Sequence, residues 1–97
     1  MTESKKRQLE WSLRSTRNVI EIENYITTDN PLAAQKLVRE IQRVAQSLCD
    51  YPMLGHAGRR AGTREIVISR YPFFVAYRLK PRKVIVLAVI HQARKYP

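Results

Sequence analysis

The 97-residue chain has one cysteine, three glycines and no long apolar run, and each shortage excludes a class of protein. Cys49 cannot form a disulfide within the chain, and neither His56 nor His91 stands at metal-ligand spacing from it. No apolar stretch approaches the roughly 20 residues that cross a bilayer, and no signal-peptide core follows the charged N-terminal residues. We therefore expect a cytoplasmic protein with no membrane contact, in which Cys49 is a buried or half-buried apolar residue.

Acidic residues are scarce in the second half of the chain. Residues 51–97 contain ten Lys and Arg residues and a single acid, Glu65, whereas residues 1–50 are close to neutral. A magnesium nuclease needs several carboxylates, so this composition excludes one. There is also no glycine-rich phosphate motif and no Ser, His and Asp arrangement of a hydrolase. No metal or cofactor is expected, and any catalysis would be metal-free.

The same imbalance predicts an anionic partner. Positive charge confined to one half of a chain is not needed for solubility, and it is typical of a surface that binds nucleic acid. An acidic protein that covers this surface would be attracted by the same field. Composition leaves both partners open.

With 97 residues, of which 44% are apolar, the chain can form one domain over residues 1–97 but not two. Apolar and polar residues alternate over residues 8–13, which predicts a strand. Ser15 or Thr16 would then cap a helix that ends near Thr28. Its apolar residues Val19, Ile22 and Ile26 share one stripe.

A second helix is predicted from Asn30-Pro31 to about Tyr51. Asn30 can cap free amides, and Pro31 at the first helical position loses no hydrogen bond. Apolar residues then recur at spacings of three and four, at Ala34, Leu37, Val38, Ile41, Val44, Ala45 and Leu48.

A glycine-rich basic loop over residues 55–62 is predicted to precede three strands. These strands cover Thr63 to Arg70, Phe73 to Lys80 and Lys83 to Ile90, each rich in β-branched or aromatic residues. Only about two residues separate successive strands, so they would form an antiparallel meander. The predicted fold class is α+β in the order β-α-α-β-β-β, with two antiparallel helices packed on a small, mostly antiparallel sheet.

The last predicted strand leads into the densest cluster of reactive side chains. Cleavage of RNA without a metal needs groups that transfer protons and cations that hold the phosphate. His91 or Tyr96 could transfer protons, and Arg64, Arg70, Arg78 or Arg94 could hold the phosphate. The simpler interpretation of His91 is a histidine that hydrogen-bonds to backbone at the end of a strand.

The arginines have two interpretations as well. They could bind the phosphates of a nucleic acid, or they could keep a sheet margin solvated. The candidates for nucleic-acid binding are Arg59, Arg60, Arg64, Arg70 and Arg78. Glu65, beside Arg64, is interpreted as an ion-pair partner rather than a general base.

Four segments together resemble the RelE/ParE superfamily of toxin–antitoxin toxins. They are Asn30-Pro-Leu-Ala-Ala34, Gly62-Thr-Arg-Glu-Ile-Val67, Tyr71-Pro72 with Val75-Ala-Tyr-Arg78, and Val89-Ile-His-Gln-Ala-Arg94 followed by Tyr96-Pro97. The resemblance covers nearly the whole chain. It implies a bacterial growth inhibitor that a cognate antitoxin, here expected to be acidic, holds inactive in a hetero-oligomer. The C-terminal segment of that antitoxin is expected along the two helices and the exposed sheet edge.

Members of this superfamily differ in their target. ParE-like members poison DNA gyrase, whereas RelE-like members cut messenger RNA on the ribosome with basic residues of the sheet and residues near the C-terminus. The paired helices and the Asn30-Pro31 start are more similar to ParE. His91, Arg94 and Tyr96 would suit a RelE-like nuclease, as would Arg70 and Arg78. The favoured prediction is a ParE-like, gyrase-directed toxin; the alternatives are a RelE-like endoribonuclease and a non-toxic basic nucleic-acid-binding module.

Overall fold

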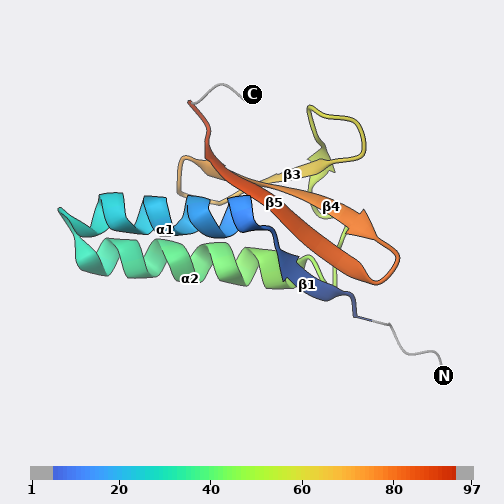
Figure 1. Ribbon diagram of the computed structural model, residues 1–97, viewed down its shortest axis with the longest axis horizontal. Coiled ribbons are helices and arrows are strands. Elements are labelled where there is room, and N and C mark those ends of the chain that lie inside the picture. The colour runs from blue at the N-terminus through green and yellow to red at the C-terminus, as the bar shows by residue number, and fades with distance from the viewer. Residues whose placement is uncertain (1–5, 94–97) are drawn as a thin grey trace.

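In the computed structural model, which describes residues 6–93, two helices pack against one face of a five-stranded sheet (Figure 1). The elements in chain order are β1 (Gln8–Trp11), α1 (Leu13–Thr27), α2 (Pro31–Ser47), β2 (His56–Ala57), β3 (Arg64–Val67), β4 (Phe73–Lys80) and β5 (Lys83–His91). The α+β class and the order of the long elements are confirmed, and β2 is a short addition within the predicted glycine loop. Within residues 6–93, no helix is both long and apolar enough to cross a membrane.

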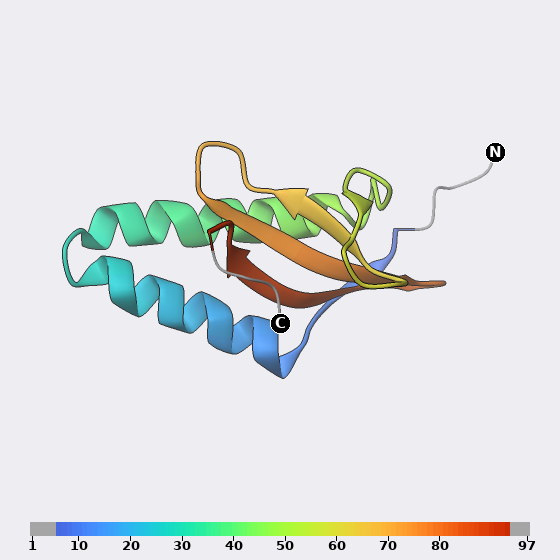
Figure 2. The same cartoon turned by 90° about the horizontal axis from the view of Figure 1, so that it is seen from above.

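The strands lie in the order β1-β5-β4-β3-β2. The predicted antiparallel meander of β3, β4 and β5 is confirmed, and only Pro81 and Arg82 join β4 to β5. β1 pairs in parallel with β5, from Gln8 beside Lys83 to Trp11 beside Val86. The first and last strands of the chain are therefore neighbours, and the helical hairpin leads from β1 to β2 at the other edge of the sheet (Figures 1 and 2).

The helix α1 starts earlier than its sequence predicts. Ser12, not Ser15 or Thr16, is the N-cap, and its side-chain oxygen accepts a hydrogen bond from the Ser15 amide at 3.0 Å. Leu13 therefore belongs to α1 rather than to the first strand, and its side chain is exposed. The reason lies outside the segment: the Ser12 amide donates to the Val86 carbonyl and the Ser12 hydroxyl to the Leu87 carbonyl, each at 3.0 Å. Strand β5 thus fixes where β1 ends.

The start of α2 is as predicted. Asn30 accepts a hydrogen bond from the Ala33 amide at 3.1 Å, and Pro31 is the first residue of the helix. Asn30→Ala is expected to lower the free energy of unfolding by about 1 kcal/mol, because the amide loses its partner. Asn30→Gly should cost only a few tenths of a kcal/mol. Urea denaturation followed by circular dichroism compares the two variants, and equal losses would contradict the role of Asn30 as a cap.

The apolar core lies between the helices and the sheet. Its largest cluster of buried residues comprises Leu37, Ile41, Val44, Ala45, Ile68, Phe73, Val75, Val86 and Val89. A second cluster continues it beyond the end of α2 and comprises Leu48, Cys49, Tyr77 and Val84. A third lies on the other face of the sheet and comprises Phe74, Ala76, Ala88 and Ile90. Strand β5 is therefore buried on both faces, as its continuous apolar sequence predicts.

Cys49 is buried in the second cluster, and this burial raises the pKa of its thiol. Because the thiolate is the reactive form, iodoacetamide should label Cys49 slowly in the native protein at pH 8 and rapidly in urea. The raised pKa also means that the folded state holds the proton more tightly. This stabilisation is complete below the ordinary thiol pKa near 8.5 and is lost as the pH rises through the folded-state pKa. Equal labelling rates with and without urea would contradict the burial.

Candidate functional site

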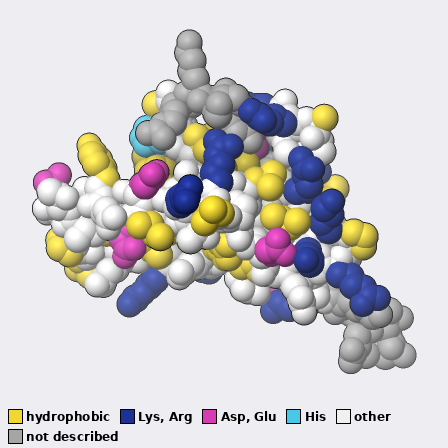
Figure 3. Space-filling model, viewed as in Figure 1, with side chains coloured by type: hydrophobic (Ala, Val, Ile, Leu, Met, Phe, Trp, Pro, Cys, Tyr) yellow, Lys and Arg dark blue, Asp and Glu magenta, His cyan; other side chains and the backbone are white. Residues whose placement is uncertain are grey.

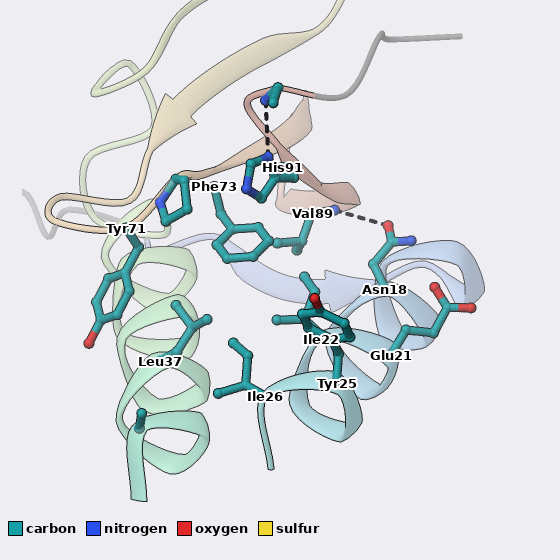
Figure 4. Close-up of a pocket in the computed structure, with 13 residues that line it drawn as sticks. Asn18, Glu21, Ile22, Tyr25, Ile26, Leu37, Tyr71, Phe73, Val89 and His91 are labelled. Carbon is teal, nitrogen blue, oxygen red and sulfur yellow. Dashed lines mark hydrogen bonds between the residues drawn. The ribbon is translucent and has the colours of Figure 1, made fainter. Parts of the chain in front are cut away.

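A groove with a volume of about 790 Å³ lies between the helical hairpin and one end of the sheet (Figure 4). Residues of α1, α2, the β3–β4 connection and the end of β5 line it: Asn18, Glu21, Ile22, Tyr25, Ile26, Ala33, Leu37, Tyr71, Pro72, Phe73, Val89, His91 and Ala93. Most of these side chains are apolar. We call this concavity the hairpin groove.

Core residues lie at the base of the hairpin groove, and Tyr25 and Tyr71 lie at its two sides. Leu37, Phe73 and Val89 belong to the main core cluster. Tyr25 belongs to α1, and its side chain is 82% exposed. The Asn18 side-chain oxygen accepts a hydrogen bond from the Val89 amide at 3.0 Å, which ties α1 to β5 (Figure 4). This hydrogen bond fixes the position of α1, which forms one side of the groove, relative to β5.

His91 lies at the rim of the groove, at the end of β5. Its ring meets the ring of Phe73 edge-on, with the centroids 5.2 Å apart. Its Nδ1 accepts a hydrogen bond from the Ala93 amide at 3.0 Å, so the predicted contact with backbone is present. Nδ1 is therefore the ring nitrogen of His91 that the backbone engages.

The structure separates two of the predicted nuclease residues, His91 and Arg78. His91 pairs with Phe73 in the sheet, whereas Arg78 pairs with Ile85. The two pairs are five residues apart along β4, or about 16 Å at the usual rise of a strand. Arg94 and Tyr96 lie outside the described residues.

Arg70 lies on the helical side of the sheet. It is in the turn between β3 and β4, with a φ of 73°, and its charge acts on Glu40 of α2. The hydrogen bonds from Arg43 to Glu40 are the main cause that lowers the pKa of this carboxyl, and Arg70 adds to them. Arg70 thus faces an acid of its own chain.

Arg64 is also occupied within the chain. Its guanidinium donates to the Met53 carbonyl at 3.3 Å and to the Gly55 carbonyl. These carbonyls belong to the turn after α2, so Arg64 supports that turn. The remaining candidates, Arg59, Arg60 and Arg78, are the ones that the loop and the outer sheet face carry.

The glycine loop is anchored by Glu65, which is only 4% exposed. One carboxylate oxygen accepts a hydrogen bond from the Arg59 amide at 3.1 Å, and the other lies 3.8 Å from the Arg59 Nε. The Arg59 guanidinium in turn lies 5.0 Å from the centre of the Phe74 ring. Glu65 is therefore an ion-pair partner, as predicted, but of Arg59 rather than Arg64. Arg60 accepts two hydrogen bonds from Thr63 at its carbonyl, which closes the loop.

Arg78 belongs to β4 rather than to the glycine loop. It is half-buried on the outer sheet face, and its Nε is buried without a hydrogen-bond partner among the described residues. Lys80 and Lys83 pair with one another on the same face, and the Lys83 Nζ lies 3.0 Å from the Glu10 carboxylate. Most Lys and Arg side chains in the space-filling view likewise lie over the sheet side of the molecule (Figure 3).

Sequence reasoning missed the hairpin groove. Ile22 and Ile26 were correctly assigned to the apolar stripe of α1, but they are half-buried and line the groove. Tyr25, between them in sequence, was the available signal, because a large aromatic residue beside a core stripe widens the apolar face. Tyr71 at the opposite wall comes from a turn whose position no local pattern predicts.

A helical hairpin packed on one face of a mixed five-stranded sheet is a fold that solved structures share. A solved structure of the chromosomal ParDE toxin–antitoxin system from P. aeruginosa matches this fold with a TM-score of 0.82. The match covers 91% of this chain and 98% of that chain at 21% identity. The fold is thus that of RelE/ParE-type toxins.

The sequence relatives identify the family more closely. Y4kP of Sinorhizobium fredii is 36% identical over 92 residues, covering 95% of each chain. Toxin RelE2 of Caulobacter vibrioides is 31% identical over 87 residues, covering 90% of this chain and 97% of its own length. The model of the ParE toxin of the type II toxin–antitoxin system parDE matches residues 9–96. This chain belongs to the ParE toxin family.

Proposed function

We propose that this ParE-family toxin arrests bacterial growth in the cytoplasm by acting on DNA gyrase. Membership of the ParE family over residues 9–96 is the observation that carries the proposal. The geometry supports it, because Arg78 and His91 belong to pairs that are five residues apart along β4. A metal-free nuclease would need its proton acceptor and its cations around one phosphate.

The hairpin groove is where we place the cognate antitoxin. An amphipathic helix binds most tightly in a hydrophobic groove that receives its apolar face, and the groove of about 790 Å³ is of that kind. The polar face of such a segment would remain near Arg70, so acidic residues are expected there. Antitoxin binding would then bury Tyr25 and Tyr71.

Measurements of growth, of DNA breaks and of messenger RNA after induced expression test the function. The expected result is growth arrest with accumulation of gyrase-linked DNA breaks, while messenger RNA keeps its length and pattern. Purified toxin should inhibit supercoiling by purified gyrase. The cognate antitoxin, which we expect to be an acidic protein encoded in the neighbouring reading frame, should relieve this inhibition. Growth arrest without DNA breaks would contradict a gyrase target, and normal growth would contradict toxicity.

The outer sheet face supports a second candidate, a ribosome-dependent mRNA endonuclease. Arg78 is half-buried with an unpartnered Nε, beside Lys80 and Lys83, which is an arrangement that could hold RNA phosphates. In that case Arg78→Ala should abolish growth arrest, and message cut at ribosomes should accumulate with the unaltered protein. If Arg78→Ala leaves growth arrest intact, this candidate is wrong.

A further inference from the structure

The turn that follows α2 exposes three apolar side chains within four residues. Tyr51, Met53 and Leu54 have exposed fractions of 66%, 65% and 59%. Single exposed apolar residues are ordinary on protein surfaces, but a contiguous group usually marks a contact with another molecule. None of the three lines the hairpin groove. We call residues 51–54 the apolar turn.

The backbone of the apolar turn is held from below. Tyr77 is fully buried, and its hydroxyl donates to the Pro52 carbonyl at 2.8 Å and accepts from the Gly55 amide at 3.0 Å. Arg64 adds its hydrogen bonds to the Met53 and Gly55 carbonyls. A turn held in this way presents its side chains in one arrangement, so binding through them loses little conformational freedom.

The surroundings of the apolar turn are basic. Arg64 contacts it directly, and the Arg7 amide donates to the Cys49 carbonyl at 3.2 Å just before the turn. The Arg7 side chain donates to the Lys80 carbonyl at 3.0 Å, which places that lysine nearby. Asp50 precedes the turn, and the Lys6 Nζ lies 3.7 Å from its carboxylate. A complementary partner surface would therefore be an apolar pocket bordered by carboxylates.

The apolar turn is separated from the hairpin groove. The groove uses Leu37 of α2, and the turn begins after Ser47, which is about 15 Å further along the helix axis. In β4 the groove residue Phe73 and the supporting residue Tyr77 are four residues apart, or about 13 Å. Figure 1 shows that α2 begins at the α1–α2 connection and ends beside β1. A segment seated in the groove leaves the turn exposed, so the turn is available to a second partner.

We propose that the apolar turn anchors the toxin to its target protein, by inserting Tyr51, Met53 and Leu54 into an apolar pocket bordered by carboxylates. The inference rests on the proposed function, because it requires a protein target. It assigns the antitoxin and the target to different surfaces of one small domain. Substitutions in the turn should then separate toxicity from antitoxin binding.

The test uses the full chain with Met53→Ser and Leu54→Ser combined, and Leu13→Ser as a matched control. Leu13 is as exposed as the turn residues but lies at the start of α1. After induction, the double variant should leave at least tenfold more survivors than the unaltered toxin, and Leu13→Ser should match the unaltered toxin. In purified form, the double variant should bind DNA gyrase at least tenfold more weakly. Its affinity for the acidic protein of the neighbouring reading frame should stay within twofold.

Three results would overturn the inference: growth arrest by the double variant equal to that of the unaltered toxin, loss of antitoxin binding by the double variant, or a dimer of the toxin that the substitutions dissociate. The last two would assign the turn to the antitoxin or to a second copy. If the unaltered toxin does not arrest growth, the proposed function fails and the inference fails with it. Should circular dichroism show that the double variant is unfolded, Met53→Ser alone provides the same comparison.

Discussion

Tyr25→Ala is expected to weaken antitoxin binding by about 30-fold, or roughly 2 kcal/mol, which is the loss typical of a central aromatic contact. Tyr25 stands at the wall of the hairpin groove and is 82% exposed in the free toxin. Its replacement therefore removes contact area from the complex without opening a cavity in the toxin. Isothermal titration of the purified toxin with the acidic protein of the neighbouring reading frame measures the change.

Leu32→Ser provides the control for this prediction. Leu32 is also largely exposed and belongs to α2, but it does not line the groove. It should bind the antitoxin as tightly as the unaltered toxin does. Both variants should keep the unfolding temperature and the growth arrest of the unaltered toxin. Equal affinities for Tyr25→Ala and Leu32→Ser would remove the antitoxin from the groove.

Gly55→Ala is expected to lower the free energy of unfolding by about 3 kcal/mol and the Tm by roughly 15 °C. A Cβ at this position would lie 2.6 Å from the Glu65 carbonyl oxygen and 2.7 Å from the Tyr77 hydroxyl. Neither atom can move freely, because one belongs to β3 and the other to a fully buried side chain. The Gly55 amide would also lose its bond to Tyr77. The free energy of unfolding of a typical small domain is only about 5 to 15 kcal/mol in total.

Gly62→Ala separates this steric effect from backbone preference. Gly62 has a φ of 78°, which disfavours alanine, but a Cβ there would meet no atom within 4 Å. The expected loss is about 1 kcal/mol. Thermal unfolding followed by circular dichroism compares the two variants. If Gly55→Ala is no less stable than Gly62→Ala, Tyr77 and Glu65 do not confine Gly55 as the structure indicates.

The start of α2 could be predicted because its cause is local. Asn30 and Pro31 supply the cap and the first helical residue from within the segment itself, and the same holds for the meander, where two residues join β4 to β5. The start of α1 could not be predicted in the same way. Ser12, Ser15 and Thr16 are all possible caps, and the hydrogen bonds from Ser12 to β5 decide between them.

The candidate site shows the same division. Charge counting assigned five arginines to one anion-binding surface, but hydrogen bonds and neighbouring charges divide them. Arg64 binds the turn after α2, Arg70 lies near Glu40, and Arg59 is held by Glu65. Of the predicted nuclease residues, His91, Arg70 and Arg78 lie within residues 6–93, where Arg78 lies apart from His91 and Arg70 lies near Glu40. Strand alternation predicts which residues share a face, but not what the turns between strands bring next to that face.

The α+β class, the helical hairpin and the meander follow from the sequence alone, because periodicity, caps and short connections act over a few residues. Four sequence segments carry the RelE/ParE resemblance. The sequence also located the positive charge in the second half of the chain. Only the tertiary structure decided that β1 lies beside β5, that a groove opens between the hairpin and the sheet, and that the apolar turn stands apart from it. These features depend on contacts between residues far apart in the chain, such as Ser12 with Leu87 and Gly55 with Tyr77, which no local pattern records.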